Sequence, residues 1–398
     1  MELKKYKLGD IADIISGVAF QPSDICNEGV RILRGGNIQS QRIIIKDDDV
    51  FLPLYYINEE NQVKIGDTIL VASTGSVEVL GKAATCFDDM KNTQIGAFLR
   101  IIRPKEERYS MLISIALNSW YFAKYIKAQA RGTSINNITV GYLKEFEIYC
   151  PNNYLSICDF YQTLEKKIAL NRKINDNLEA MAKQLYDYWF VQFDFPNEEG
   201  KPYKSSGGKM VWNEKLKREI PEGWEVETIG TFADIKRGST ITKAQTVEGN
   251  IKVVAAATDY SFMHNEPNRS AYVITVSASG ANAGFINFWR EPIYASDCST
   301  IQCKDVVETL YCYYWIRHFQ ELLFTQQIGA AQPHVYPEHI NKIPIVIPPQ
   351  LLLDKIRKLL VRANKQQGEL TKQIANLTKQ RDELLPLLMN GQVSVNYD

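Results

Sequence analysis

The amino-acid sequence predicts an α+β protein built from two tandem domains of similar fold, each followed by a long helix. Three observations support this prediction. The same framework segments occur in both halves, each half mixes short strand-like segments with a few helices, and each half ends in a stretch with seven-residue apolar spacing. Strands and helices that do not alternate regularly are typical of the α+β class. With 398 residues, the chain has room for two domains of ordinary size.

The internal repeat extends over three framework segments. They are ADIISG (12–17) with ADIKRG (233–238), residues 66–87 with 271–289, and residues 131–151 with 328–349. In the second pair, a strand, a glycine-containing turn and another strand follow one another in both copies. The second copy is shorter in its middle, so the two copies share a framework and differ in their insertions.

Within each copy, the pattern predicts strands and one principal amphipathic helix. The segments RIIIKDDDVFL, DTILVAS and AFLRIIRP are rich in β-branched residues and read as strands. Residues 109–130 place apolar side chains at helical spacing, and residues 308–328 are their counterpart in the second copy.

Two long segments, residues 154–190 and 351–391, are predicted to be helices that pair with each other. Both have apolar residues at heptad positions, which gives the narrow apolar stripe of a coiled coil. The polar residues in this stripe, Asn171, Asn175 and Gln367, are of the kind that fixes register at a cost in stability. The alternative is that each helix packs only on its own domain. The residues predicted to form the pairing seam are Leu164, Ile168, Leu178, Leu185, Leu370, Ile374, Leu377 and Leu384.

These patterns predict a division of the chain into six parts. A stretch rich in Gly, Ser, Lys and Glu separates the copies and reads as a linker. The predicted parts are domain 1 (1–153), helix 1 (154–190), the linker (191–222), domain 2 (223–350), helix 2 (351–391) and a tail (392–398).

The sequence lacks the motifs of the common catalytic classes. STGSVEVLGKAAT has the wrong glycine spacing for a Walker A loop and no Ser or Thr after Lys82. No GxGxxG follows a strand, and the Asn- or Asp-Pro-Pro-aromatic segment of DNA amino-methyltransferases is missing. The four histidines have no cysteine or carboxylate at ligand spacing. We therefore expect a chain that is not an enzyme and carries neither a metal nor a cofactor.

Composition limits the partners and the compartment. The chain has 46 basic and 46 acidic residues, so it lacks the basic footprint of a protein that grips nucleic acid alone. Any such binding would be local, or another subunit would supply the phosphate contacts. No apolar run approaches the ~18 residues of a membrane span, and the N-terminus has no signal-peptide core. We expect a cytoplasmic protein whose seven cysteines are reduced thiols.

Polar loops occur at matched places in the two copies and are the candidate nucleic-acid contacts. Asn, Gln, Ser, Thr, Arg and His read base edges and hold phosphates, and glycine lets the backbone approach closely. Each loop alone could be an ordinary turn, but two such sets on one framework predict recognition. The candidates in the first copy are Arg34, Asn37, Ser73, Thr74, Ser76, Lys91, Asn92, Gln94, Arg131, Thr133, Asn136 and Asn137. Those in the second copy are Arg237, Ser239, Thr240, Lys243, Ser277, Ser279, Asn282, Ser296, Gln332 and His334.

Three longer phrases carry a family resemblance. They are LYDYWFVQFDFP (185–196), GKMVWNEKLKREIPEGWEV (208–226) and RDELLPLLMNGQVSV (381–395). In these phrases, and in its two-copy architecture, the chain resembles the specificity subunit of type I restriction–modification systems. The resemblance covers essentially the whole chain.

The resemblance implies a function for each part. Each copy would be a target recognition domain that reads one half of a bipartite, asymmetric DNA site. The two domains would lie in a pseudo-twofold arrangement. The two helices would pair antiparallel, act as a spacer and dock two methyltransferase subunits, which bind S-adenosylmethionine. Motor and nuclease subunits would complete the restriction enzyme. A helix of ~37 residues is roughly 55 Å long. It would hold the two domains on the order of one to one and a half DNA turns apart, at ~34–36 Å per turn.

Two other classes of protein remain as alternatives. One is a tandem-domain scaffold for protein interactions without a role on DNA. The other is a stand-alone DNA methyltransferase or nuclease, which the missing motifs disfavour.

Overall fold

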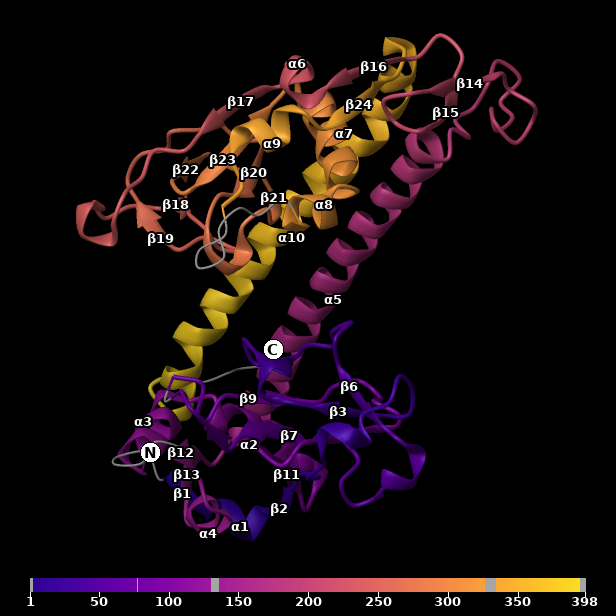
Figure 1. Cartoon of the computed structure of the whole chain (residues 1–398). Coiled ribbons are helices and arrows are strands. Elements are labelled where there is room, and N and C mark those ends of the chain that lie inside the picture. The colour runs from indigo at the N-terminus through magenta and orange to yellow at the C-terminus, as the bar shows by residue number, and fades with distance from the viewer. Residues whose placement is uncertain (1–2, 77, 130–135, 326–333, 394–398) are drawn as a thin grey trace. The chain divides into compact units, whose positions relative to one another are not determined.

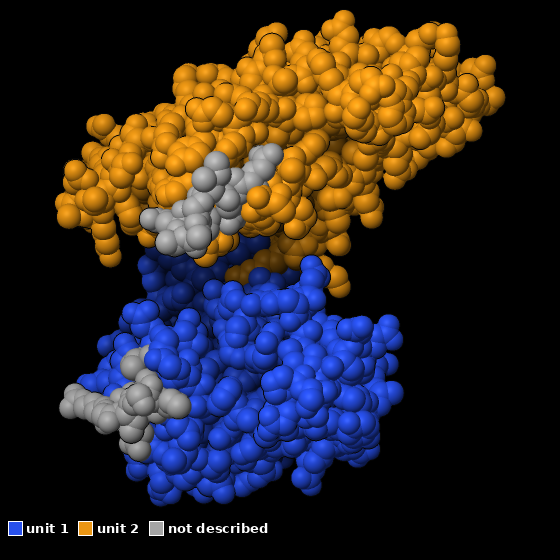
Figure 2. Space-filling view, in the orientation of Figure 1, with its two compact units in different colours: residues 1–170, 374–398 blue, residues 171–373 orange. Residues whose placement is uncertain are grey.

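The computed structural model describes residues 3–76, 78–129, 136–325 and 334–393. The chain forms two compact units (Figure 2). Unit 1 comprises Met1–Leu170 and Ile374–Asp398, and unit 2 comprises Asn171–Gln373. Unit 1 is therefore built from both ends of the sequence.

Unit 1 contains three principal sheets (Figure 1). The first is an antiparallel sheet in the order β2 (Ala12–Ser16), β11 (Leu99–Pro104), β7 (Thr68–Val71) and β9 (Ala83–Thr85). The second has the order β10 (Thr93–Ile95), β3 (Val30–Leu33) and β6 (Val50–Leu52), with β10 parallel to β3. In the third, β1 (Leu3–Lys7) pairs antiparallel with β13 (Glu147–Pro151). The helices of this domain are α1 (Leu8–Ile11), α2 (Ser110–Leu117), α3 (Trp120–Gln129) and α4 (Val140–Lys144).

Unit 2 repeats this topology. Its four-stranded sheet has the order β17 (Asp234–Arg237), β23 (Cys298–Gln302), β20 (Val273–Ser277) and β21 (Ile286–Trp289). Its three-stranded sheet is β19 (Phe262–His264), β18 (Ile251–Val254) and β22 (Ile293–Ala295), again with one parallel pair. The terminal pair is β16 (Glu225–Thr228) with β24 (Pro344–Ile347). The helices are α6 (Ile229–Phe232), α7 (Val306–Arg317), α8 (Gln320–Thr325) and α9 (Pro337–Asn341). The predicted α+β class and domain duplication are confirmed.

The repeated ADI phrase marks a crossing at which glycine is required. A Cβ atom on Gly17 would lie 2.2 Å from the Gly96 carbonyl oxygen, and one on Gly238 would lie 2.1 Å from the Ser296 carbonyl oxygen. The next residue in each copy donates its backbone N–H to the strand that it crosses, Val18 at 2.8 Å and Ser239 at 2.9 Å. The same close backbone approach therefore explains why the phrase ends in glycine in both copies.

The predicted helix at 109–130 is two helices. α2 ends at Leu117, and the Ser119 hydroxyl accepts a hydrogen bond from the Phe122 N–H at 3.2 Å, which caps the start of α3. Hydrophobic periodicity alone does not show such a break, because both helices bury apolar residues. The counterpart likewise divides into α7 and α8, and its last residues lie outside the described chain.

The two long helices are α5 (Tyr154–Tyr186) and α10 (Gln350–Met389). In unit 2, the Asn171 side chain bonds Gln373 at 3.2 Å and the Gln367 side chain bonds Glu179 at 3.0 Å. Residue numbers rise along one helix as they fall along the other, so the helices pack antiparallel. Of the predicted seam residues, Ile168 and Leu370 are buried. The other predicted seam residues are half-buried: Leu164, Leu178, Leu185, Ile374, Leu377 and Leu384.

The segment after α5 is ordered around aromatic side chains. A π-helical turn covers Asp187–Val191, and the hairpin β14 (Met210–Asn213) with β15 (Arg218–Pro221) follows it. Phe193, Phe195 and Trp224 belong to the buried core of unit 2. Trp212, on β14, is 58% exposed.

A buried ion pair joins the helices inside unit 1. Arg381 Nη1 lies 2.7 Å from Glu165 Oε1, and the two side chains are 6% and 11% exposed. Replacing one member leaves the other charge buried without its partner, which costs about 3–5 kcal/mol, whereas replacing both with apolar groups is often neutral.

We therefore predict that Arg381→Met lowers the free energy of unfolding by about 3–5 kcal/mol and that adding Glu165→Leu restores most of it. Urea denaturation of the full chain measures both. Lys379→Met is the matched control, because Lys379 pairs with Glu383 on the exposed surface at 3.8 Å and should change the free energy by less than about 1 kcal/mol. A double variant less stable than either single one would contradict the prediction.

Candidate nucleic-acid interface

In unit 1, two of the predicted loops meet around a hollow of about 770 Å³. One side is the turn Gly35–Asn37 and the hairpin of β4 (Ile38–Gln39) with β5 (Arg42–Ile43). The other side is the loop that follows β7. Besides the apolar residues Ile38, Val71 and Val79, the hollow is lined by Gly35, Gly36, Gln39, Ser40, Ser73, Thr74, Gly75, Lys82 and Phe98. Predicted candidates Arg34 and Ser76 are exposed beside these loops.

Asn37 is a buried residue that stabilises the turn Gly35–Asn37 at one side of this hollow. It is 2% exposed, and its amide donates to the Ile44 carbonyl at 2.8 Å and to Asp49 Oδ1 at 2.6 Å. Its own oxygen accepts the Arg34 N–H at 2.7 Å, so the side chain closes the turn that presents Arg34. Asn37 therefore holds the loop in shape, and its amide faces the protein interior.

Asp49 is the charged end of this support. Its carboxylate is fully buried and pairs with Arg31 at 2.8 Å. Burial opposes its ionisation, but hydrogen bonds from Asn37, from the Lys46 backbone and from Arg31 outweigh burial and hold the pKa of Asp49 below its usual value. The loop is therefore anchored to an ionised carboxylate at neutral pH.

A second pair of predicted loops also comes together. β8 (Ser73–Thr74) pairs antiparallel with β12 (Asn136–Asn137), and the Ile138 N–H bonds the Ala72 carbonyl at 2.8 Å. The Asn137 side chain is exposed at this pair, so it lies next to the hollow. Of the remaining candidates in this stretch, Arg131 and Thr133 lie outside the described residues.

Three candidates of unit 1 lie elsewhere. β10 runs parallel to β3, and the Arg31 N–H bonds the Asn92 carbonyl at 2.8 Å. Lys91 and Asn92 are thus exposed at the start of β3, whereas Arg34 follows its end. Gln94 is fully buried, and its amide donates to the Tyr56 carbonyl at 3.0 Å.

Unit 2 brings its loops together at the equivalent place. Ser279 forms a β-bridge with His334, as Thr74 does with Asn136, and the Val335 N–H bonds the Ala278 carbonyl at 2.9 Å. The His334 ring stacks on Tyr336, with centroids 5.9 Å apart. The Arg237 guanidinium lies 5.9 Å from the centre of the same tyrosine ring. A cation and two rings are therefore grouped beside the bridge.

Most of the hydroxyl candidates in unit 2 support the loops. The Ser296 oxygen accepts the Ile241 N–H at 3.2 Å, the Ser277 hydroxyl bonds the Ala257 carbonyl at 3.2 Å, and the buried Ser279 hydroxyl bonds the Asp297 carboxylate. Asn282 is half-buried and bonds the Ala256 carbonyl at 3.5 Å. The exposed candidates are Arg237, Ser239, Thr240 and Lys243. Gln332 lies outside the described residues.

Sequence reasoning missed several residues of these surfaces. Gln39, Ser40, Lys82 and Phe98 line the first hollow, and Tyr336 is the ring that contacts both Arg237 and His334. Phe98 is 67% exposed, and a base can stack on such a ring. The signal available was an aromatic residue inside a polar loop, as in the segment QPHVYP.

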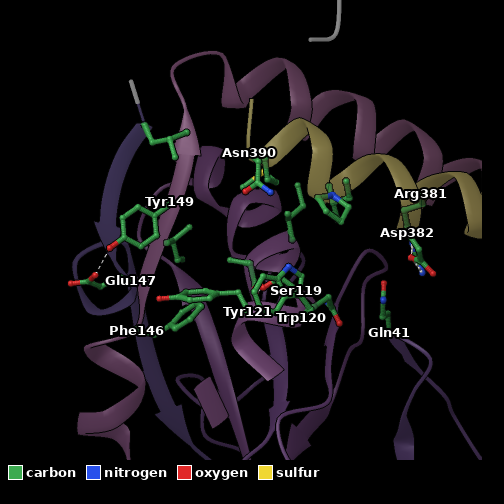
Figure 3. Close-up of a pocket in the computed structure, with 18 residues that line it drawn as sticks. Gln41, Ser119, Trp120, Tyr121, Phe146, Glu147, Tyr149, Arg381, Asp382 and Asn390 are labelled. Carbon is green, nitrogen blue, oxygen red and sulfur yellow. Dashed lines mark hydrogen bonds and ion pairs between the residues drawn. The ribbon is translucent and has the colours of Figure 1, made fainter. Parts of the chain in front are cut away.

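A second concave surface of unit 1 is a groove of about 630 Å³ between α3, β13 and the last turns of α10 (Figure 3). Trp120 and Tyr121 lie in it, with Trp120 64% exposed. Polar groups lie at its two opposite ends, Arg381 with Asp382 at one and the Tyr149 hydroxyl, which bonds Glu147 at 2.6 Å, at the other. Its apolar lining includes Leu3, Ile115, Ile148, Leu385, Pro386 and Met389. No sequence motif indicated this groove.

Comparison with known proteins identifies the family. A family model described as the type I restriction modification DNA specificity domain matches residues 1–180 and 221–379. The specificity subunit of the type I restriction enzyme MjaIX of Methanocaldococcus jannaschii is 25% identical over 323 residues, covering 74% of this chain and 72% of that one. The HindI specificity subunit of Haemophilus influenzae is 20% identical, with 77% and 82% covered. A crystal structure of a type I S subunit from M. genitalium has the same fold, with a TM-score of 0.59 at 16% identity and 99% and 97% coverage.

A match in both halves of the chain defines a duplicated DNA specificity domain. The chain therefore belongs to the family of specificity subunits of type I restriction–modification systems. It is a DNA specificity subunit, a non-catalytic component of such a system, as the sequence predicted. None of the helices among the described residues is long and apolar enough to cross a membrane.

The anchor of the first hollow generates a prediction about acid stability. Because the pKa of Asp49 is lowered on folding, its contribution is present above the unfolded-state value of about 3.9 and is lost as the pH falls through the folded-state value. Asp49→Asn should lower the free energy of unfolding at pH 7 by about 1–3 kcal/mol and by much less near pH 3. Thermal unfolding across this range measures the effect. Asp48→Asn, at an exposed neighbour, is the control, and equal effects of the two changes would contradict the prediction.

Proposed function

We propose that domain 1 (residues 1–153) and domain 2 (residues 223–350) each read one half of a bipartite, asymmetric DNA sequence. The observation that carries this proposal is the pair of matched bridges, Thr74 with Asn136 and Ser279 with His334. The same backbone arrangement presents different side chains in the two domains. A shared frame with different reading groups is what two different half-sites require.

The two surfaces offer different chemistry to a base edge. The surface of unit 1 combines Lys82, the Gln39 amide and the Phe98 ring. The surface of unit 2 combines Arg237 with the rings of Tyr336 and His334. Arg and Lys favour guanine edges or phosphates, amides suit adenine, and rings stack on exposed bases. The exposed members of the predicted set, together with these residues, form the proposed DNA contacts.

The helices (154–190 and 351–391) would set the unread spacer and dock two methyltransferase subunits, with residues 191–222 as the linker and 392–398 as a tail. The balanced charge of 46 basic and 46 acidic residues supports a shared grip on double-stranded DNA, in which partner subunits supply most phosphate contacts. S-adenosylmethionine would then be bound by those methyltransferase subunits. Motor and nuclease subunits would complete the assembly, in the cytoplasm with the DNA.

The groove of Figure 3 supports a protein partner at the end of α10. Exposed aromatic residues that gather in a concave apolar surface are typical of protein interfaces. Its α10 residues, Leu385, Pro386 and Met389, make it continuous with the helix pair. We assign the groove to a methyltransferase subunit, because the family functions within a methylating complex.

Domain exchange tests the reading function. Replacing residues 1–150 with the equivalent domain of a relative should change one half of the methylated motif and leave the other half unaltered. The reciprocal exchange of residues 223–350 should change only the other half, and it serves as the control. Sequencing of methylated adenines in cells with and without each chimera measures both. Changes in both halves from a single exchange would contradict independent reading.

The groove yields a separate prediction. Trp120→Ala should weaken binding of the cognate methyltransferase subunit by at least about tenfold, because a large exposed ring at the centre of an interface contributes about 2 kcal/mol or more. Calorimetric titration of the purified chain measures the affinity. Tyr55→Ala is the control, since Tyr55 is an aromatic residue of the same unit that is 79% exposed and does not line the groove. Equal affinities for the two variants would remove the groove from the docking surface.

A further inference from the structure

A network of side-chain hydrogen bonds joins the helix pair to the rest of unit 2. Gln367 on α10 is 2% exposed. Its amide nitrogen donates to Glu179 Oε2 on α5 at 3.0 Å, and its oxygen accepts a bond from Arg290 Nη2 at 2.7 Å. Arg290 directly follows β21 and so belongs to the recognition domain. Gln367 therefore bonds the partner helix and the domain at the same time.

Glu179 extends the network to α7. Its Oε2 also accepts the Tyr314 hydroxyl at 3.3 Å, and Arg317 Nη1 lies 3.6 Å from its Oε1. Tyr314 is buried, and burial together with the neighbouring Glu179 raises the pKa of its hydroxyl, which keeps it a hydrogen-bond donor. Two elements of the domain, the end of β21 and α7, are thus tied to one point of the helix pair.

Apolar packing alone would define the position of the domain on the helix pair less precisely than these hydrogen bonds do. Ala182 and Tyr186 of α5, and Ile356 and Leu360 of α10, share a core with the domain. Such contacts are non-directional, and apolar groups recur at each turn of both helices, so a rotated or shifted helix could still bury them. Hydrogen bonds need defined distances and angles, and a shift would leave buried polar atoms unpaired. The network therefore selects one register among several that the apolar core permits.

We propose that Gln367 is a positioning residue that fixes the register and orientation of domain 2 on the helix pair, and through it the length of spacer DNA that the protein accepts. This inference rests on the proposed function of the helices as the spacer. Gln367 itself does not contact DNA in this proposal, so the sequences of the half-sites do not depend on it.

Adjacent glutamines provide a matched test. Gln367 is buried, whereas Gln366 is exposed on the same helix. Gln367→Leu and Gln366→Leu are each assembled as full chains with the cognate methyltransferase subunit. Methylation rates are then measured on duplexes with the natural spacer, with one base pair more or fewer, and with a base change in one half-site. Arg290→Lys, which keeps the charge, and Arg290→Met form a second pair that keeps the test decisive if Gln367→Leu does not assemble.

The expected result is specific to the spacer. Gln367→Leu removes the hydrogen bonds to Glu179 and from Arg290. It should therefore reduce the preference for the natural spacer by about tenfold, while discrimination against the altered half-site stays at the wild-type ratio. Gln366→Leu should retain both ratios, and Arg290→Lys should retain more spacer preference than Arg290→Met. Unchanged spacer preference in Gln367→Leu and in Arg290→Met overturns the proposal, as does a parallel loss of spacer and half-site discrimination. If the wild-type chain itself shows no bipartite motif, the proposed function fails rather than the assignment of Gln367.

Discussion

The antiparallel pairing of α5 with α10 is the constraint on which the rest of the structure depends. The last turns of α10 complete unit 1, where Leu385 and Met389 pack on its core and Arg381 bonds Glu165 across a separation of 216 residues. The core of unit 1 therefore includes residues that follow unit 2 in the sequence. Contacts of such separation carry a large loop-closure cost that only the finished packing offsets. Folding of unit 1 is thereby tied to the presence of the second helix.

This dependence contrasts with the independence of the polar loops. The loops are stabilised by side chains that form hydrogen bonds with the loop backbone, such as Asn37 in unit 1 and Ser296 in unit 2. A buried amide or hydroxyl can satisfy backbone groups that lack a strand partner, so an irregular loop keeps a fixed shape on a regular sheet. Exposed positions in the same loops can then vary without disturbing the frame. The shape of the loop backbone and the chemistry of the exposed loop surface are therefore determined by different residues.

Local patterns in the sequence were sufficient to predict the frame. The repeated ADI phrase and the heptad spacing led to the duplicated α+β domain and the long helices, because strand, turn and helix preferences are short-range properties. Burial of individual polar residues is not such a property. Asn37 and Gln94 are amide residues, a type that can read base edges. In the structure, however, Asn37 anchors a turn and Gln94 is fully buried. Arg381 follows the predicted seam residue Ile374 by seven positions, but its partner Glu165 can be identified only when the helices are paired. The groove is lined by β1, α2, α3, β13 and the end of α10, which come from both ends of the sequence, so no local pattern could show it.

The same distinction bears on how a new specificity can arise. The exposed loop residues can change freely, but a replacement domain 2 must still present a partner to the buried Gln367 where Arg290 stands now. A domain without that donor would leave a polar atom of the helix pair buried and unpaired. It would keep its own polar loops and lose its fixed position on the helices. The residues that constrain exchange between relatives are therefore those at the junction with the helix pair, rather than the exposed residues of the polar loops.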